Sequence, residues 1–149
     1  MNETIKIFTI GFTQKTAREF FTHLMKAGVR TLVDVRLNNV SQLAGFTKKD
    51  DLEYFLQTIA KIGYIHKPDL SPTKEILNAY KNKEIDWDEY ESRYCELLKT
   101  RKAEILVASE DMNGSCLLCS ESTAEKCHRR LLAEYLRGCW ENKVVIHHL

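Results

Sequence analysis

The alternation of strand-like apolar runs with capped helical segments constrains the fold of this chain more than any other feature. Several of the runs are nearly continuous, as expected of strands that are covered on both faces of a parallel sheet. They lie at residues 5–10, 31–36, 63–68, 115–120 and 144–149. The pattern predicts a single α/β domain over residues 1–149, with a mainly parallel sheet of about five strands and helices on both faces, in a Rossmann-like three-layer arrangement.

Helices are expected between these strands, and most have a recognisable start signal. Capping-box spacing, with a short polar residue three positions before glutamate, occurs at Thr16–Glu19, Asp86–Glu89 and Ser122–Glu125. The predicted helices run from Thr16 to about Ala27, from Thr47 to about Ile62, from Ser71-Pro72 to about Asn82, from Asp86 through Leu98, and from Ser122 to Gly138. Residues 104–109 fit either a strand or a short helix.

Composition places the chain among ordinary soluble proteins of a reducing compartment. Its formal net charge of +1 disfavours tight nonspecific binding to duplex nucleic acid or to an anionic membrane. No apolar run approaches the roughly 20 residues that a membrane span needs, and a signal-peptide pattern is missing. The five cysteines are an odd number. We therefore expect a cytoplasmic protein without a disulfide framework.

Polar and reactive side chains gather at the carboxyl ends of the predicted strands, which is where ligands bind in open parallel sheets. They are Thr9, Gly11, Asp34, Arg36, His66, Cys119 and Glu121. The helix after the 115–120 run starts at the same edge and carries Cys127, His128 and Arg129. Because these residues come from separate segments, the sequence predicts a shared polar site that binds a ligand.

Helix periodicity places His128 near the middle of an apolar stripe, with Cys127 at one edge and Arg129 beyond the other. His128 should therefore point toward the strand that ends in Cys119 and Glu121. A cysteine near a helix N-terminus with arginines close by favours the thiolate. We therefore assign the two cysteines, Glu121 and His128 as candidate catalytic residues, although Glu121 could also be a cap for the following helix.

Structural roles are the alternative for several of these residues. Cys119 could be a small buried side chain of the strand, and His128 could bond a backbone carbonyl of the core. Arg36 could pair with Asp34 on the same face of the sheet, or it could bind an anion together with Arg129. The sequence leaves these alternatives open.

Metal binding is a further alternative at the same residues. Cys119, Cys127 and His128 could supply three ligands and leave a fourth position open, but their spacing matches none of the common zinc patterns. The C-x-x-C pair, Cys116 and Cys119, would point to opposite faces of its strand. P-loop and dinucleotide-binding motifs are absent. We therefore assign no metal ligand from the sequence, and the cofactor is unknown.

Four segments of the chain resemble the bacterial domain-of-unknown-function family numbered 488. They are TIGFTQKTAREFF (9–21), LVDVRLNNVSQLAGF (32–46), YIHKPDLSPTKEIL (64–77) and LLCSESTAEKCHRRLLAEYL (117–136). The combination of a DVR strand with L-C-x-E and C-H-R is specific, and the resemblance covers nearly the whole chain. It implies that the candidate residues named above match the family's signature, but it implies no particular activity. The DVR strand also resembles rhodanese-like domains, whose cysteine loop is not evident here, so sulfur transfer is not implied.

The leading functional hypothesis is an enzyme that acts on an anionic substrate such as a nucleotide or modified nucleic acid, as a Cys/His-dependent hydrolase or transferase. Cys127 or Cys119 would be the nucleophile. His128 or Glu121 would transfer the proton, and the two arginines would bind the anion. The alternatives are a non-catalytic module that binds a nucleotide or nucleic acid, and a metal-binding redox or regulatory protein. The expected partner is a small anionic ligand or nucleotide, and the oligomeric state is not predicted.

Overall fold

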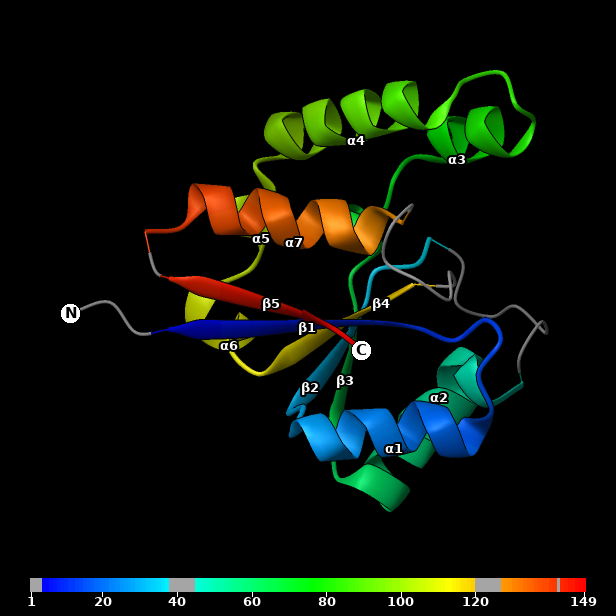
Figure 1. The fold of residues 1–149 in the computed structure, drawn as a ribbon, viewed down its shortest axis with the longest axis vertical. Helices are drawn as coiled ribbons and strands as arrows, with labels where there is room; N and C mark the ends of the chain where they lie inside the picture. Colours follow the sequence, from blue (N-terminus) through cyan, green and yellow to red (C-terminus); the bar gives the residue numbers. More distant parts are fainter. Residues whose placement is uncertain (1–3, 38–44, 120–126, 142) are drawn as a thin grey trace.

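A five-stranded sheet forms the centre of the protein, and all of its strands run parallel in the order β3-β2-β4-β1-β5 (Figure 1). The computed structural model describes residues 4–37, 45–119, 127–141 and 143–149. The strands are β1 (Ile5–Gly11), β2 (Thr31–Asp34), β3 (Gly63–His66), β4 (Ser115–Cys119) and β5 (Val144–His148). Each of them falls within a predicted run or next to it. The predicted parallel three-layer α/β architecture is confirmed.

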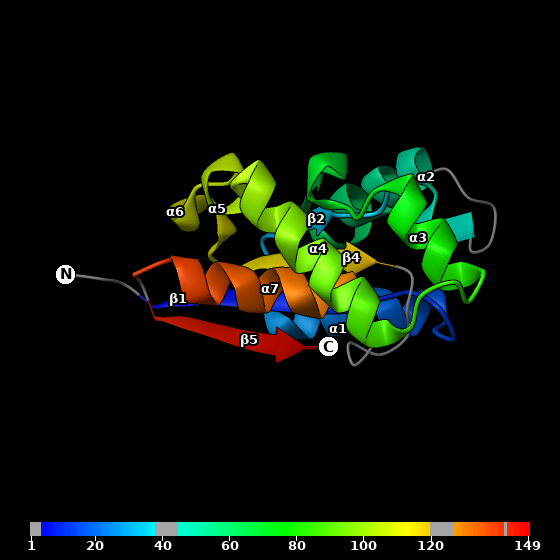
Figure 2. The same ribbon diagram turned by 90° about the horizontal axis from the view of Figure 1, so that it is seen from above.

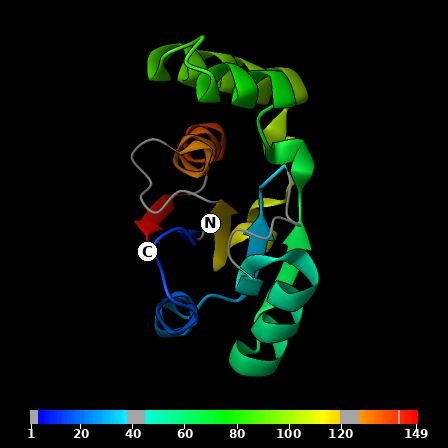
Figure 3. The ribbon, with the colours of Figure 1, turned by 90° about the vertical axis from the view of Figure 1, so that its right-hand side faces the viewer.

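Two groups of helices cover opposite faces of this sheet (Figures 2 and 3). From β1 through β2 to β3 the chain moves toward one edge, and from β3 through β4 to β5 it moves toward the other. Right-handed crossovers then require the connecting helices to change faces. Accordingly, α1 (Ala17–Ala27) and α2 (Lys49–Phe55) lie on one face, whereas α7 (His128–Cys139) lies on the other, with α4 (Trp87–Arg101) packed outside it.

Helix α1 begins and ends where the sequence predicts. The hydroxyl of Thr16 accepts a hydrogen bond from the Glu19 N–H, and the Glu19 carboxylate accepts one from the Thr16 N–H. This capping box satisfies two backbone donors that have no partner inside the helix. Gly28, at a φ of 76°, ends the helix in the left-handed conformation that glycine adopts at little cost.

The boundaries of the second helix differ slightly from the prediction. Thr47 belongs to a short 3-10 helix, η1 (Gly45–Thr47), and the N-cap of α2 is Lys48. A π-helical turn, η2 (Leu56–Ala60), continues α2, so the helical segment ends two residues before Ile62. The left-handed conformation of Lys61, at a φ of 58°, ends it.

The connection from β3 to β4 consists of helices joined by turns and contains no strand. A 3-10 helix, η3 (Pro68–Leu70), precedes α3 (Lys74–Lys81), which Thr73 caps rather than the predicted Ser71. The predicted cap of α4 is confirmed, because Asp86 accepts the N–H of Glu89. Residues 104–106 lie in α5 (Ala103–Leu106) and Ser109 begins α6 (Ser109–Met112), so the segment 104–109 forms no strand.

Helix α7 starts later than the capping signal at Ser122 predicts. Its N-cap is Cys127, whose backbone is extended at φ −142° and ψ 143°, and its first residue is His128. Ser122 itself lies outside the described residues. The prediction for the other end is also wrong, because Gly138 is helical and Trp140 is the C-cap. The later start moves Cys127 from the body of a helix to its N-terminus.

Two apolar clusters fill the spaces between the sheet and the helices, one on each face of the sheet. The cluster under α1 and α2 includes Phe8, Phe20 and Leu32. The cluster under α7 and α4 includes Ile7, Val33 and Leu132. Neighbouring strand residues therefore alternate between the clusters, as they must when both faces of a sheet are buried. No helix in the described part of the chain is both long and apolar enough to cross a membrane.

Two glycine-to-alanine substitutions should have opposite effects on stability. Gly28→Ala forces a Cβ into the left-handed region and should cost about 1 kcal/mol. Gly138 lies within α7, and a Cβ added there has no atom within 4 Å other than the backbone of its own helix. Gly138→Ala should therefore stabilise the protein by up to about 1 kcal/mol. Urea unfolding of the two variants measures the difference, and equal stabilities would contradict the assigned backbone conformations.

Candidate functional site

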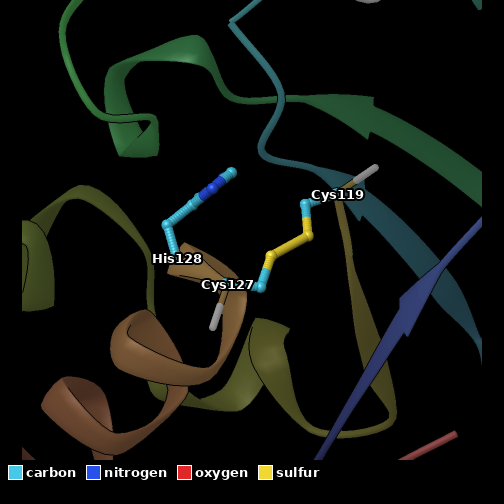
Figure 4. A group of neighbouring side chains, drawn as sticks. All are labelled: Cys119, Cys127 and His128. Carbon is cyan, nitrogen blue, oxygen red and sulfur yellow. A yellow bond between two sulfur atoms is a disulfide. The ribbon is translucent and has the colours of Figure 1, made fainter. Parts of the chain in front are cut away.

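A disulfide between Cys119 and Cys127 lies at the carboxyl edge of the sheet (Figure 4). Cys119 is the last residue of β4, and Cys127 is the N-cap of α7. Both side chains are buried, with exposed fractions of 1% and 3%. This bond was not predicted, because the sequence favours a chain without a disulfide framework. Cys95, Cys116 and Cys139 are free. The disulfide joins two of the four predicted catalytic residues.

His128 lies beside the two sulfur atoms and is fixed by the backbone just beyond the end of β2. Its Nε2 is 2.9 Å from the carbonyl oxygen of Val35. A carbonyl can only accept, so Nε2 carries the proton and Nδ1 carries the lone pair. Burial lowers the pKa of His128 to about 4, which keeps the ring neutral near neutral pH. The Tyr94 ring packs edge-on against the imidazole, with 5.7 Å between centroids.

Arg129 brings a buried positive charge to the same place. It is the second residue of α7 and is fully buried, unlike most arginines. Its Nη1 donates to Sγ of Cys119 across 3.1 Å. A guanidinium at this distance stabilises negative charge on sulfur, so a reduced Cys119 would favour the thiolate.

Thr9 and Gly11 lie on the strand next to β4, on the α7 side of the sheet. In the β1–β4 register Gly11 is opposite Cys119, and both are buried. The hydroxyl of Thr9 is 2.6 Å from Nδ1 of His148, the last residue of β5. Thr9 is therefore held by a C-terminal histidine that the sequence did not mark as important.

Asp34 and Arg36 form a buried network on the opposite face of the sheet. The Arg36 guanidinium donates from Nε to Oδ1 and from Nη2 to Oδ2 of Asp34, each across 2.8 Å. Nη2 also donates to the Thr47 carbonyl, and the Tyr64 hydroxyl donates to Asp34 Oδ2 across 2.6 Å. The guanidinium lies over the Phe12 ring of the cluster under α1. Of the two alternatives for Arg36, the structure shows the ion pair.

His66 connects this network to the cysteine site through the backbone. It ends β3, and its Nε2 is 2.8 Å from the carbonyl oxygen of Arg36. The preceding carbonyl, that of Val35, is the acceptor for His128. Two histidines from different elements therefore hold consecutive carbonyls just beyond the end of β2.

A pocket of about 840 Å³ opens beside the start of α7. Cys127 and His128 form part of its wall, and the remaining wall comes from α3, α4 and the turn between them. Trp87 and Tyr90 stack there at 4.9 Å between ring centroids, with Tyr80 close to both. Lys81 and Lys83 supply positive charge, whereas Glu84 and Asp86 supply negative charge.

The structure divides the predicted site residues into two sets. Cys119, Cys127, His128 and Arg129 lie together on the α7 side, with Thr9 and Gly11 on the adjacent strand. Asp34, Arg36 and His66 interact on the other side through the end of β2. Glu121 lies outside the described residues. The pocket residues Tyr80, Trp87 and Tyr90 were missed, because their spacing in the sequence is that of an ordinary apolar helix face.

Loss of the buried ion pair should destabilise the fold strongly. Asp34→Asn removes the charge that holds Arg36 and should cost about 3–5 kcal/mol, because a buried guanidinium is left without its partner. Glu89→Gln breaks the exposed pair with Arg93 and should cost less than about 1 kcal/mol. Chemical denaturation compares the two, and a similar small loss in both would show that Asp34 has no structural role.

Comparison with known proteins identifies the family of this chain. The family model described as "Domain of unknown function DUF488" matches residues 16–136, which include β2, β3, β4 and the two cysteines of the disulfide. No curated protein and no solved structure matches the chain. The match spans most of the sequence and agrees with the resemblance noted from its motifs. The chain therefore belongs to the family of the domain of unknown function DUF488.

Proposed function

We propose that this protein is a thiol-dependent enzyme that acts on an anionic substrate such as a nucleotide, with Cys127 as the nucleophile. One observation carries the proposal: Cys127 and His128 stand in the wall of a large pocket, and their sulfur and ring nitrogen lie within 4.8 Å of each other. A cysteine and a histidine at this distance, next to a space for a substrate, are the parts that nucleophilic thiol catalysis requires.

The surroundings of Cys127 favour its thiolate. As the N-cap of a twelve-residue helix, it lies at the positive end of the helix dipole. The lone pair of His128 is on Nδ1, which is therefore the nitrogen that can accept the thiol proton. The hydrogen bond to Val35 holds the ring in this tautomer, as the third member of a catalytic triad does.

Cys119 supplies the second sulfur of the site, which is bonded to that of Cys127 in the oxidised protein. The disulfide is the oxidised form of the site, and the nucleophile becomes available only when this bond is reduced. Reduction by an external dithiol transfers two electrons and two protons to the cysteines and leaves the dithiol oxidised. Arg129 then stabilises the Cys119 thiolate, and the Cys127 thiol faces the pocket.

The pocket has the features that a nucleotide needs. The stacked Trp87 and Tyr90 rings offer apolar, aromatic surface to a planar base. Lys81 and Lys83 in the same wall can bind the phosphate. In this proposal these lysines take the anion-binding role that the sequence suggested for Arg36, because Asp34 already holds that guanidinium on the other face of the sheet.

Alkylation after reduction should single out Cys127. Protein reduced with dithiothreitol and then treated with iodoacetamide near neutral pH should be modified at Cys127 roughly tenfold faster than at the exposed Cys139. Cys116 should stay unmodified, because burial raises the pKa of its thiol. Peptide mass spectrometry gives the rates.

Two controls make the alkylation test specific. Unreduced protein should show no labelling of Cys127, and His128→Asn should slow the reaction at Cys127 without affecting Cys139. A Cys127 that reacts no faster than Cys139 in the reduced protein would rule out the proposed nucleophile.

Binding of a nucleotide should be visible in the fluorescence of Trp87. The chain has two tryptophans, so Trp140→Phe leaves Trp87 as the single reporter. Adenosine 5′-monophosphate should quench it with saturation, and adenosine should bind more weakly. Replacing Lys81 and Lys83 together by glutamine should weaken the monophosphate roughly tenfold, or about 1.4 kcal/mol. Lys26 lies outside this pocket, so Lys26→Gln is the control. If both variants bind the monophosphate with the same affinity, or if the quenching does not saturate, the proposal of a nucleotide ligand is wrong.

A further inference from the structure

We infer that the reduced protein binds a thiophilic divalent cation, best matched by Zn²⁺, through Cys119 Sγ, Cys127 Sγ and one ring nitrogen of His128. These three ligand atoms all lie within 4.8 Å of one another, and all three residues are buried (Figure 4). Two thiolates and an imidazole are a donor set that zinc prefers. The inference goes beyond the proposed function and does not depend on it.

The hydrogen bond of His128 prepares the ring for a metal. Its Nε2–H donates to the Val35 carbonyl, which leaves the Nδ1 lone pair as the available donor. Metal-binding histidines nearly always donate their other N–H to a carbonyl or carboxylate, which fixes the tautomer and orients the ring. This hydrogen bond is independent of the positions of the cysteines, and it is a second observation that favours a metal site.

The separation of the two cysteines also suits an ion. Their Cα atoms are 7.5 Å apart, whereas most disulfides join Cα atoms about 4.4–6.8 Å apart. Two thiolates of a tetrahedral zinc site, with Zn–S bonds of about 2.3 Å, lie about 3.8 Å apart. After reduction, the end of β4 and the start of α7 can therefore accept an ion between the sulfurs with the elements held where they are.

Charge and access at the site are consistent with a cation that keeps an open position. The two thiolates neutralise Zn²⁺, and the hydrogen bond from Arg129 Nη1 to Cys119 Sγ, across 3.1 Å, helps to orient that sulfur. Because Cys127 and His128 also form part of the pocket wall, the fourth position faces the space where a ligand or water can enter. Three protein ligands with one open position are typical of zinc sites that exchange a ligand.

Oxidation of the cysteines should release the ion. A small-molecule disulfide accepts two electrons from the two metal-bound thiolates; the Cys119–Cys127 bond forms, the bond of the oxidant breaks, and two small thiolates and Zn²⁺ leave. The disulfide form has no thiolate left to bind a metal. The site therefore couples metal occupancy to the redox state of the cysteines, and a bound ion keeps Cys127 from reacting as a nucleophile.

Cobalt titration tests the site directly. Full-length protein, reduced and freed of reductant without oxygen, should take up one equivalent of Co²⁺ with intense thiolate-to-cobalt charge-transfer absorption, and Zn²⁺ should displace it. Cys127→Ser and His128→Asn should each weaken uptake by on the order of tenfold or more. Oxidised protein should take up no metal at this site. Cys139→Ser removes an exposed thiol that is not part of the site, and this variant should bind Co²⁺ as the unsubstituted protein does.

The outcomes separate this inference from the proposed function. Absence of charge-transfer absorption in the reduced parent, or uptake that is unchanged in both variants, would overturn the metal site. Circular dichroism confirms that the variants are folded, and Cys119→Ser serves as a second test if one of them is not. Alkylation of Cys127 in the presence of a chelator reports the nucleophile alone, so either proposal can fail while the other stands.

Discussion

The position of β4 between β1 and β2 is the constraint on which the site depends. Because the strand enters the middle of the sheet, its last residue, Cys119, is surrounded by the ends of its neighbours. The chain must then return over the α7 face to reach β5 at the far edge. This brings the first turn of α7 back across the ends of β4 and β2, where His128 bonds the Val35 carbonyl. One hydrogen bond thus ties the helix that carries the reactive residues to the strand on the far side of Cys119.

The two faces of the sheet divide the polar residues at its edge by role. On the α1 face, the Asp34 carboxylate accepts hydrogen bonds from the Arg36 guanidinium, the Arg36 N–H and the Tyr64 hydroxyl, and Arg36 also donates to the Thr47 carbonyl. Such a closed network fixes the backbone that leaves β2, and it gives the carbonyls of Val35 and Arg36 their positions. On the α7 face, that backbone positions His128, and with it the two cysteines and Arg129, next to a pocket. The Asp34–Arg36 network therefore supports the cysteine site structurally, and the proposed chemistry uses only residues of the cysteine site.

The sulfurs of Cys119 and Cys127 have three possible states: bonded to each other, reduced and free, and reduced and bound to a metal ion. Bonded to each other, Cys119 and Cys127 are chemically protected. Reduced and free, Cys127 has the helix terminus and the imidazole that a nucleophile needs. Reduced and bound to an ion, both sulfurs are ligands, and the imidazole completes the set. The residues are the same in each state, so what decides between them is the supply of reductant and of metal, which lies outside the protein.

Local patterns of hydrophobic period, helix capping and burial are enough to predict which segments form strands and helices along the chain, the parallel sheet, and the residues at its carboxyl edge. The Thr16–Glu19 box and the Asp86 cap are read from four consecutive positions and were confirmed. The start of α7 could not be read this way, since Ser122 has the same local signal, whereas His128 at the first turn is held by the Val35 carbonyl just beyond β2. Three relations exist only in the folded protein: Arg36 faces away from the cysteines, Cys119 is bonded to Cys127, and Trp87 and Tyr90 line a pocket beside them. These relations join residues far apart in the chain, and they depend on which strands become neighbours, a property of the whole fold that no local pattern contains.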